Sequence, residues 1–270
     1  MPRVLFMVER QQSGPLGLAA GRQLVRSARS STEKMPWKEL RSLEGVIETE
    51  FLRPIPFRAR PARHGVLPLE GNQLLDGEDA RLDLYPGLAD WWRRAEQLWL
   101  YHRSSDRLTL RDQLDFRKKL TNQLPTPPLR VVYGKAGMHV SAALVENPAA
   151  VVDHTLCWGT VSSRSEGLHL SSLLNSPAIT NLVRPLMSYG KDERHVDKHI
   201  WKLPIPLFDD SKPIHRRLSD LGEHCTDLVA ALDPGASGNF VTLRRRIRSA
   251  LAADSTAIEI NELVLDLLFT

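Results

Sequence analysis

Apolar residues return at helical spacing in several segments of the chain, and these segments predict most of its helices. The clearest runs over residues 88–103, where Leu88, Trp92, Ala95 and Trp99 fall on one face. Such a stripe is typical of a helix that packs one side against a core. Similar patterns predict further helices over 38–43, 166–174, 176–187, 215–232, 243–251 and 260–268.

Alternating apolar positions between frequent Pro and Gly residues predict short β-strands. The opening stretch alternates at Val4, Phe6 and Val8, which is the period of a half-buried strand. Further strands are predicted over 46–52, 65–69, 129–133, 139–145 and 151–161, with a hairpin at 134–137 and an edge or extended strand at 203–206. Residues 11–28 favour a loop, because glycine and proline recur there.

These elements together predict an α+β fold, with an irregular mixed sheet of short strands, packed helices and a helical C-terminal tail. We place a domain boundary near Asp210. The predicted domains are therefore residues 1–210 and a C-terminal helical segment of residues 211–270.

Composition limits the class of protein without naming a function. The chain has 270 residues, 42% hydrophobic and 25% charged, with a net charge of +4 and a pI near 9.2. These values are typical of a folded protein for which a nucleic-acid partner is permitted but not required. Two distant cysteines predict free thiols, and no segment resembles a signal peptide or a membrane span. We expect a cytoplasmic protein with no membrane partner.

Three basic segments offer charge for a DNA backbone. The first holds Arg103, Arg107, Arg111, Arg117, Lys118, Lys119 and Arg130, with Asn122 and Gln123 inside it. The second holds Lys191, Arg194, Lys198 and Lys202, interleaved with Tyr189, His195 and His199. The third is 244–248. Arg and Lys neutralise phosphates, while Asn, Gln and Arg also read base edges.

A solvated or internally paired face is the alternative explanation for each segment. Asp106, Asp112 and Asp115 partly neutralise the first cluster. Packing against acidic neighbours explains the arginines of 244–248 about as well as DNA contact does.

Several motifs occur in an order that resembles a known family. An apolar helix ends in Leu173-Leu174-Asn175-Ser176, and the basic connector 191–198 and the stretch 203–206 (Leu-Pro-Ile-Pro) follow it. Stretches that continue the resemblance earlier in the chain are 37–40, 46–54, 91–99, 119–123 and 130–133. Together they resemble the target-recognition region of bacterial adenine-N6 DNA methyltransferases, including type IIG restriction-modification enzymes. In that family an N-terminal methyltransferase domain, which this chain lacks, precedes the region.

The resemblance implies where DNA would bind. The segment around 118–130 and the connector 191–198 would face duplex DNA, and the Leu-Leu-Asn-Ser helix would be scaffold. The predicted DNA-binding residues are Arg111, Arg117, Lys118, Lys119, Asn122, Gln123, Arg130, Lys135, Tyr189, Lys191, Arg194, His195 and Lys198. We expect a split subunit, a fragment or a remnant that positions a separate methyltransferase domain or subunit.

Catalytic motifs are incomplete along the chain. An adenine-N6 methyltransferase needs an Asn/Asp/Ser-Pro-Pro-aromatic loop, and the nearest match, 126–129, reads Thr-Pro-Pro-Leu. The stretch 233–240 resembles a cofactor loop, but helical spacing precedes it where a strand is required. His195 and His199 are spaced to face one metal ion, but no third ligand stands at a convincing spacing. Residues 153–154 and 162–165 contain the residue types of a catalytic triad, but the Gly-x-Ser-x-Gly nucleophile motif is absent. We expect no catalysis and no cofactor in this chain, with S-adenosylmethionine held by the partner domain.

Two other functions stay open. The chain is alternatively a self-contained or remnant S-adenosylmethionine-dependent DNA methyltransferase that uses 233–240. It is alternatively a protein-interaction subunit without DNA contact.

Overall fold

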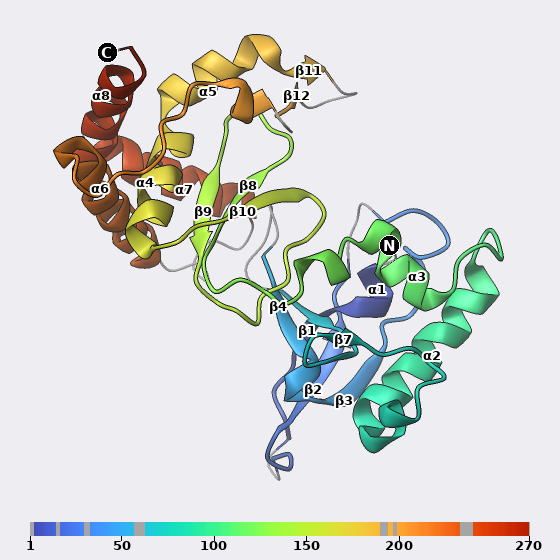
Figure 1. Ribbon diagram of the computed structural model, residues 1–270. Helices are drawn as coiled ribbons and strands as arrows, with labels where there is room; N and C mark the ends of the chain where they lie inside the picture. The colour runs from blue at the N-terminus through green and yellow to red at the C-terminus, as the bar shows by residue number, and fades with distance from the viewer. Residues whose placement is uncertain are drawn as a thin grey trace. The chain divides into compact units, whose positions relative to one another are not determined.

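The computed structural model describes residues 3–14, 17–29, 33–56, 63–189, 194–196, 199–232 and 240–269. Contacts divide the chain into two compact units. The first contains the described residues of 1–56, 62–126 and 149–151, and the second those of 127–148 and 152–270 (Figure 1). The boundary predicted near Asp210 lies inside the second unit, and the division of function that it marks stays a prediction.

The first unit is built on an antiparallel sheet. Its strands are β1 (Met7–Arg10), β2 (Arg22–Ser27), β3 (Glu44–Glu48), β4 (Leu52–Ile55) and β5 (Arg63–Val66), in the order β3-β2-β1-β5-β4. Pro54 lies in β4, an edge strand, where a missing backbone N–H breaks no ladder. A small hairpin, β6 (Leu69–Glu70) and β7 (Gln73–Leu74), follows.

Three local predictions in this unit are wrong. The opening strand begins as a helical turn, α1 (Arg3–Phe6), before β1 continues it. Residues 22–27, expected in a loop, form β2 because they pair with both β1 and β3. Residues 38–43 form a turn and bend followed by irregular backbone instead of a helix. At residues 22–27, pairing in the sheet outweighs the local pattern.

Helix α2 (Pro86–His102) confirms the strongest helix prediction. All four residues of the predicted stripe are buried, and the Trp91 indole N–H donates to the Leu5 carbonyl at 2.8 Å. The first turn is capped from a distance, because the Glu48 carboxylate of β3 accepts from the backbone N–H groups of Gly87 and Leu88 at 3.0 and 2.9 Å. The helix is thus fastened to the sheet at its N-terminus.

Short helical turns complete the first unit. The 3₁₀ turns are η1 (Thr49–Phe51), η2 (Ala80–Leu84), η3 (Phe116–Lys118) and η4 (Thr121–Gln123). Helix α3 (Leu110–Leu114) begins at a capping box in which Thr109 and Asp112 bond each other's backbone N–H. Leu110, Leu114 and Leu120 join the core that α2 forms with the sheet.

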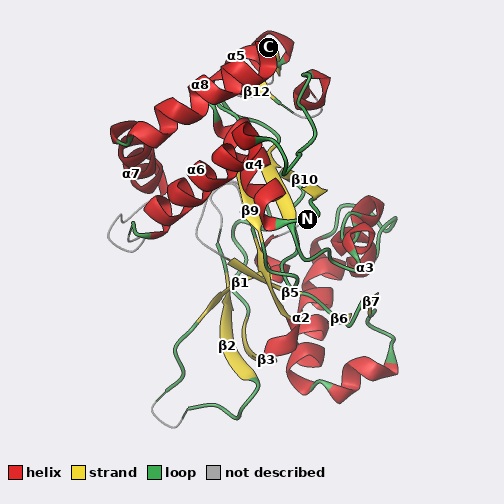
Figure 2. Ribbon diagram, turned by 60° about the vertical axis from the view of Figure 1, so that its left-hand side comes forward, coloured by secondary structure: helices red, strands yellow, loops and turns green. Residues whose placement is uncertain are grey.

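The described part of the second unit combines a three-stranded antiparallel sheet with packed helices, of which α4 contacts strands β8 and β9. The strands β8 (Arg130–Gly134), β9 (Ala142–Val145) and β10 (Leu156–Thr160) take the order β10-β8-β9. The helices are α4 (Arg164–Asn175), α5 (Pro177–Val183), α6 (Pro213–Ala230), α7 (Phe240–Ala253) and α8 (Ser255–Phe269). Helix α6 packs against α4, α7 and α8 (Figure 2), and all these strands and helices overlap the segments predicted for them.

Between α5 and α6 the described residues form short elements. They are η5 (Arg184–Leu186), the ribbon of β11 (Ser188–Tyr189) and β12 (Arg194–His195), and η6 (His199–Lys202). Residues 203–206, predicted as an edge or extended strand, carry no strand pairing.

The Leu-Leu-Asn-Ser motif is scaffold, as the resemblance implied. Leu173 and Leu174 are fully buried. The Asn175 carboxamide accepts from the Ala142 N–H and donates to the Ala142 carbonyl, both at 2.9 Å, so it continues the ladder beyond edge strand β9. The Ser176 hydroxyl caps α5 by accepting from the Ile179 N–H at 3.2 Å.

The predicted α+β class is confirmed. In the described part of the chain the strands pair antiparallel in separate sheets instead of in one mixed sheet. No helix among these residues combines the length and apolar content that a bilayer crossing requires.

Candidate nucleic-acid interface

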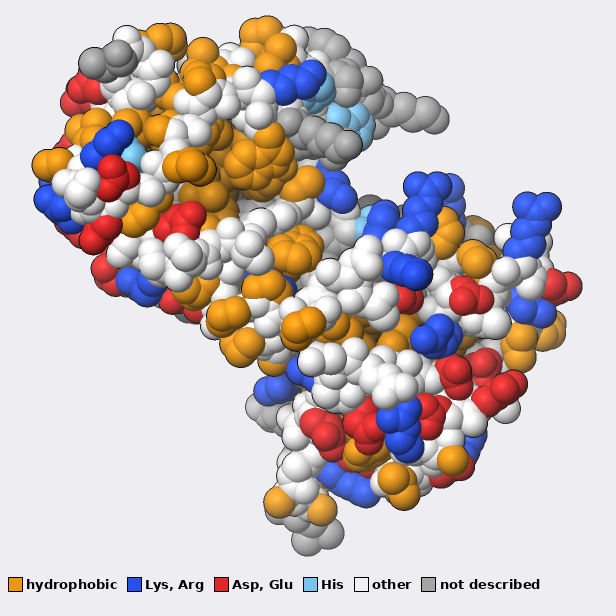
Figure 3. Space-filling view, in the orientation of Figure 1, with side chains coloured by type: hydrophobic (Ala, Val, Ile, Leu, Met, Phe, Trp, Pro, Cys, Tyr) orange, Lys and Arg blue, Asp and Glu red, His pale blue; other side chains and the backbone are white. Residues whose placement is uncertain are grey.

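Residues 116–119, here called the basic loop, form a charged tip in the first unit. Arg117, Lys118 and Lys119 are all exposed, and Lys and Arg side chains stand out over the α2–α3 part of this unit (Figure 3). Leu114 and Leu120, on either side of the loop, are buried in the core. The basic loop is therefore anchored at both ends by buried core residues.

Asp115 determines the path of the basic loop. Its carboxylate accepts from the backbone N–H groups of Leu120 and Thr121 at 2.9 and 3.0 Å and from the Thr121 hydroxyl at 2.7 Å. Its carbonyl accepts from the Lys118 N–H at 2.7 Å. The described hydrogen bonds that Asp115 oxygens accept come from Lys118 in the loop or from Leu120 and Thr121 just after it. Asp115 therefore holds the loop closed, and we call these hydrogen bonds the Asp115 clasp.

Two adjacent basic residues hold left-handed backbone conformations. The φ angle is 58° at Arg117 and 55° at Lys118. This region costs a residue with a Cβ about 1–2 kcal/mol, and such strain gathers at functional sites. The conformation turns successive basic side chains outward, and the Arg117 guanidinium lies 5.3 Å from the Phe116 ring.

The acidic neighbours do not neutralise the basic loop through ion pairs. Asp106 pairs with Arg103 at 2.7 Å. Asp112 serves the capping box, and hydrogen bonds from Thr109 lower the pKa of its carboxyl. Asp115 serves the backbone of the loop itself. The charge of the three basic side chains thus faces solvent.

Three further predicted residues lie beside the loop. Asn122 is exposed, and Arg111 is half-buried with an Nε that has no hydrogen-bond partner in the described structure. Gln123 is instead buried, and its amide donates to the Lys119 carbonyl at 2.8 Å. A buried amide bonded to the backbone cannot reach a base edge, so Gln123 supports the loop.

Arg130 also differs from the prediction. It is fully buried on β8, and its guanidinium donates to the Asn147 carbonyl at 3.0 Å. Burial lowers the pKa of the guanidinium from its ordinary value, as desolvation of a cation does. We therefore correct its assignment from DNA contact to support of the second unit.

The second unit brings Lys135 next to His195. Ala136 forms an isolated bridge with His195, and the Lys135 carbonyl accepts from the Val196 N–H at 2.7 Å. Val196 is fully buried and Lys135 is half-buried, while His195 is exposed. The connector is thus fastened to the loop that follows β8, although sixty residues separate the two in sequence.

The remaining connector residues are described in part. The backbones of Tyr189 and Arg194 pair in the ribbon of β11 and β12. Lys191 and Lys198 lie outside the described residues.

Trp201 is an exposed aromatic residue that the sequence did not single out. Half of it is exposed, and its indole N–H donates to the hydroxyl of buried Tyr133 at 2.9 Å. A sequence carries no signal for this, because most tryptophans in this chain lie in the cores.

The described residues do not form an assembled catalytic site that would support the enzymatic alternatives. The Ser162 hydroxyl donates to the Glu166 carboxylate at 2.6 Å, and the Ser163 hydroxyl accepts from the Glu166 N–H at 3.1 Å, at the start of α4. Asp153 and His154 contact each other at 3.4 Å. Among the described residues no three His, Cys, Asp or Glu side chains gather as metal ligands. Residues 233–239 of the predicted cofactor-like loop lie outside the described residues, and helix α6 precedes them, as the spacing predicted.

Comparisons with known proteins find similarity at the level of solved structures. No family model and no curated protein matches the chain. Among solved structures it is similar to the type IIL restriction-modification enzyme MmeI in complex with DNA, with a TM-score of 0.51 and 9% sequence identity. The match covers 81% of this chain but 28% of that enzyme. The likeness shows a shared fold.

Proposed function

We propose that this chain is the DNA-recognition module of a restriction-modification or DNA-methylation system. It binds duplex DNA in a sequence-dependent way and positions a separate adenine-N6 methyltransferase domain, which holds S-adenosylmethionine. The observation that carries the proposal is the basic loop, where three exposed cations stand on a strained and clasped backbone. The fold shared with a DNA-bound restriction-modification enzyme supports it.

The strain of the basic loop is the reason to assign it a ligand. Left-handed residues at 117 and 118 cost folding free energy, and both side chains are exposed instead of packed in the core. Held in this form, the three cations lose little freedom when they meet phosphates, so binding needs less ordering.

We assign binding affinity and sequence discrimination to different residues. The cations of the loop and the group around Lys135 and His195 supply affinity through phosphates, which carry no sequence information. Asn122 and Arg111, beside the loop, have side chains able to form bidentate contacts with base edges. One such contact is worth about 1–3 kcal/mol of discrimination.

Binding of the purified chain to duplex DNA across a salt series tests the proposal. Three phosphate contacts by the basic loop give log K a slope of about −2.7 against log salt. Replacing Arg117, Lys118 and Lys119 by Gln removes that part of the slope. Selection of bound duplexes from a random pool yields a motif if the module reads sequence. A flat salt response, or no enrichment after selection, contradicts the proposal.

Calorimetry with S-adenosylmethionine separates a recognition module from a complete enzyme. We expect no heat of binding with this chain alone. Saturable binding of the cofactor favours the self-contained methyltransferase instead.

One observation favours the second candidate, a protein-interaction subunit. Ile258, Leu265 and Phe269 are exposed at 61%, 39% and 70%, and their spacing places them on one face of α8. The same face fits contact with the catalytic partner. Replacing Ile258 and Leu265 by Glu disrupts the partner complex and leaves DNA binding unchanged if both roles exist. If this variant disrupts the partner complex and the unmodified chain does not bind DNA, the second candidate is favoured.

A further inference from the structure

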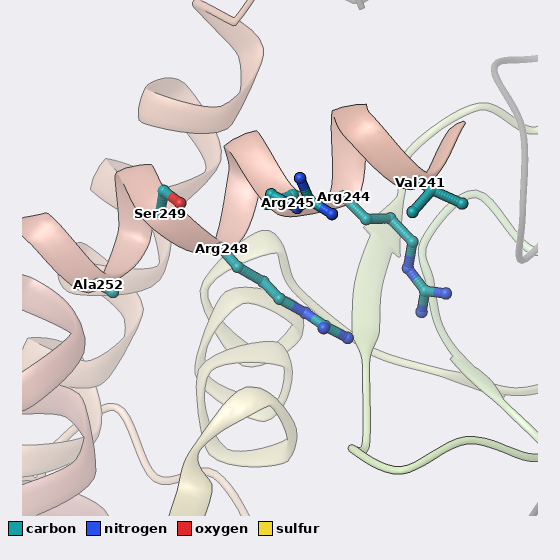
Figure 4. Close-up of a pocket in the computed structure, with 6 residues that line it drawn as sticks. All are labelled: Val241, Arg244, Arg245, Arg248, Ser249 and Ala252. Atoms are coloured by element: carbon teal, nitrogen blue, oxygen red, sulfur yellow. The ribbon is translucent and has the colours of Figure 1, made fainter. Parts of the chain in front are cut away.

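One face of α7 carries a row of arginines along a hollow of about 520 Å³. The residues that line it recur at helical spacing and are Val241, Arg244, Arg245, Arg248, Ser249 and Ala252. Arg244 and Arg248 extend to the same side of the helix (Figure 4). A single helix face thus combines cations with small side chains that leave room between them.

The alternative explanation for these arginines was pairing with acidic neighbours. Arg245 and Arg248 are exposed, and neither forms an ion pair or a hydrogen bond within the described part of the chain. Other arginines of the same unit do pair: Arg164 contacts Glu146 and Glu223, and Arg217 binds Glu259 through two bonds of 2.6 and 2.8 Å. The α7 face therefore keeps its positive charge.

Other cations lie close to this face. Burial lowers the pKa of His139, and the positive charges of Arg248, Arg184 and Arg244 lower it further. His139 belongs to the segment between β8 and β9, and Arg184 to η5. Positive charges of α7 and η5 thus act together at His139, beside the arginine face.

We propose that this arginine face of α7 binds the sugar-phosphate backbone of duplex DNA, as a contact additional to the basic loop and the connector. The inference rests on the proposed function and extends it to a helix outside the predicted DNA-binding residues. Arg245 and Arg248 are separated by about 4.5 Å along the helix axis, so one strand offers each a different phosphate.

The lining favours DNA over an acidic protein segment. Protein interfaces depend on aromatic or large apolar anchors set in pockets. The described lining of this hollow offers Val241, Ser249 and Ala252 beside the arginines. Guanidinium groups around small side chains fit phosphate oxygens, which they bind in pairs.

The test is the double variant Arg245→Gln/Arg248→Gln of the full chain. Gln keeps helix propensity, and circular dichroism checks the fold. The matched control, Arg164→Gln/Arg217→Gln, removes the same net charge from paired arginines of the same unit. Binding is measured by fluorescence anisotropy on a selected duplex and on scrambled duplexes from 50 to 200 mM salt. Partner capture by the catalytic subunit is measured in parallel.

We expect the α7 variant to bind DNA tenfold or more weakly at low salt and to lose about 1.8 from the salt slope. The loss is equal on all duplexes, because phosphates carry no sequence, and the control changes far less. If the parent binds DNA and the α7 variant binds as tightly with the same slope, the inference fails while the proposed function stands. Loss of the partner with unchanged DNA binding assigns the face to an acidic protein and also overturns it. A parent chain that binds no DNA overturns both.

Discussion

Thr121 donates to the Asp115 carboxylate twice, through its backbone N–H at 3.0 Å and its hydroxyl at 2.7 Å. An acidic residue thus holds the most basic loop of the first unit in place. By charge alone Asp115 opposes DNA binding, while by geometry it presents the cations that bind. The two effects have opposite signs, so a variant separates them.

We predict that Asp115→Ala weakens DNA binding although it makes the chain more positive. Loss of the clasp leaves backbone N–H groups of the loop without their acceptor, which costs about 1–3 kcal/mol of folding free energy. Asp115→Asn keeps an acceptor oxygen and retains most of the binding. Asp112→Ala, in helix α3 just before Asp115, removes the same charge but leaves the Asp115 hydrogen bonds intact. Urea unfolding and anisotropy measure both quantities, and tighter binding by Asp115→Ala contradicts the prediction.

Glycine at position 118 is expected to stabilise the chain or leave its stability unchanged. Lys118 has a φ of 55°, whereas Lys119 has a φ of −70°. Lys118→Gly relieves strain, while Lys119→Gly only adds freedom to the unfolded chain and costs about 0.5–1 kcal/mol. Both variants lose one phosphate contact and about 0.9 of the salt slope. Equal unfolding midpoints for the two variants show that the backbone at 118 is not strained.

Arg130→Ala is expected to act on stability and not on DNA affinity. The substitution leaves a cavity on β8 and removes the donor to the Asn147 carbonyl, for a loss of about 2–4 kcal/mol. The folded protein keeps its DNA affinity within about twofold. A salt slope reduced as in the Lys119 variant assigns Arg130 to the interface after all.

Two facing histidines predict a loss of stability in acid. His169 of α4 and His215 of α6 are buried with ring centroids 4.7 Å apart. Burial and the neighbouring His215 lower the pKa of His169 to about 4, and burial and Lys212 lower the pKa of His215. Between about 4, the pKa of His169, and about 6.5 the unfolded chain binds more protons, so stability is complete above pH 6.5 and falls as the pH drops toward 4. His169 alone accounts for roughly 3 kcal/mol.

Chemical unfolding between pH 4 and pH 7 measures this effect. His169→Phe, which keeps an aromatic ring beside Phe208, is expected to flatten the pH dependence. The exposed His195→Gln variant serves as control. An unchanged slope in His169→Phe assigns the acid sensitivity to other groups.

Prediction from sequence succeeded where a segment carries its own pattern. The four residues of the predicted α2 stripe, all buried, repeat at helical spacing, and no other contact is needed to predict that helix. It failed at residues 22–27, which form a strand because two neighbours supply hydrogen-bond partners. Asp115 was recognised as an acid in a basic segment, but its clasp depends on the backbone path of the loop.

The sequence by itself determined the α+β class, the apolar faces of the helices and the location of the basic segments, because composition and periodicity are local properties. Only the tertiary structure decided which charged side chains are exposed and available to contact a partner. It buries Arg130 and Gln123, pairs Arg164 and Arg217 with glutamates, and leaves Arg245 and Arg248 exposed without an ion-pair partner in the described part of the chain. Burial and pairing arise from contacts between residues distant in sequence, and those contacts exist only once the chain has folded.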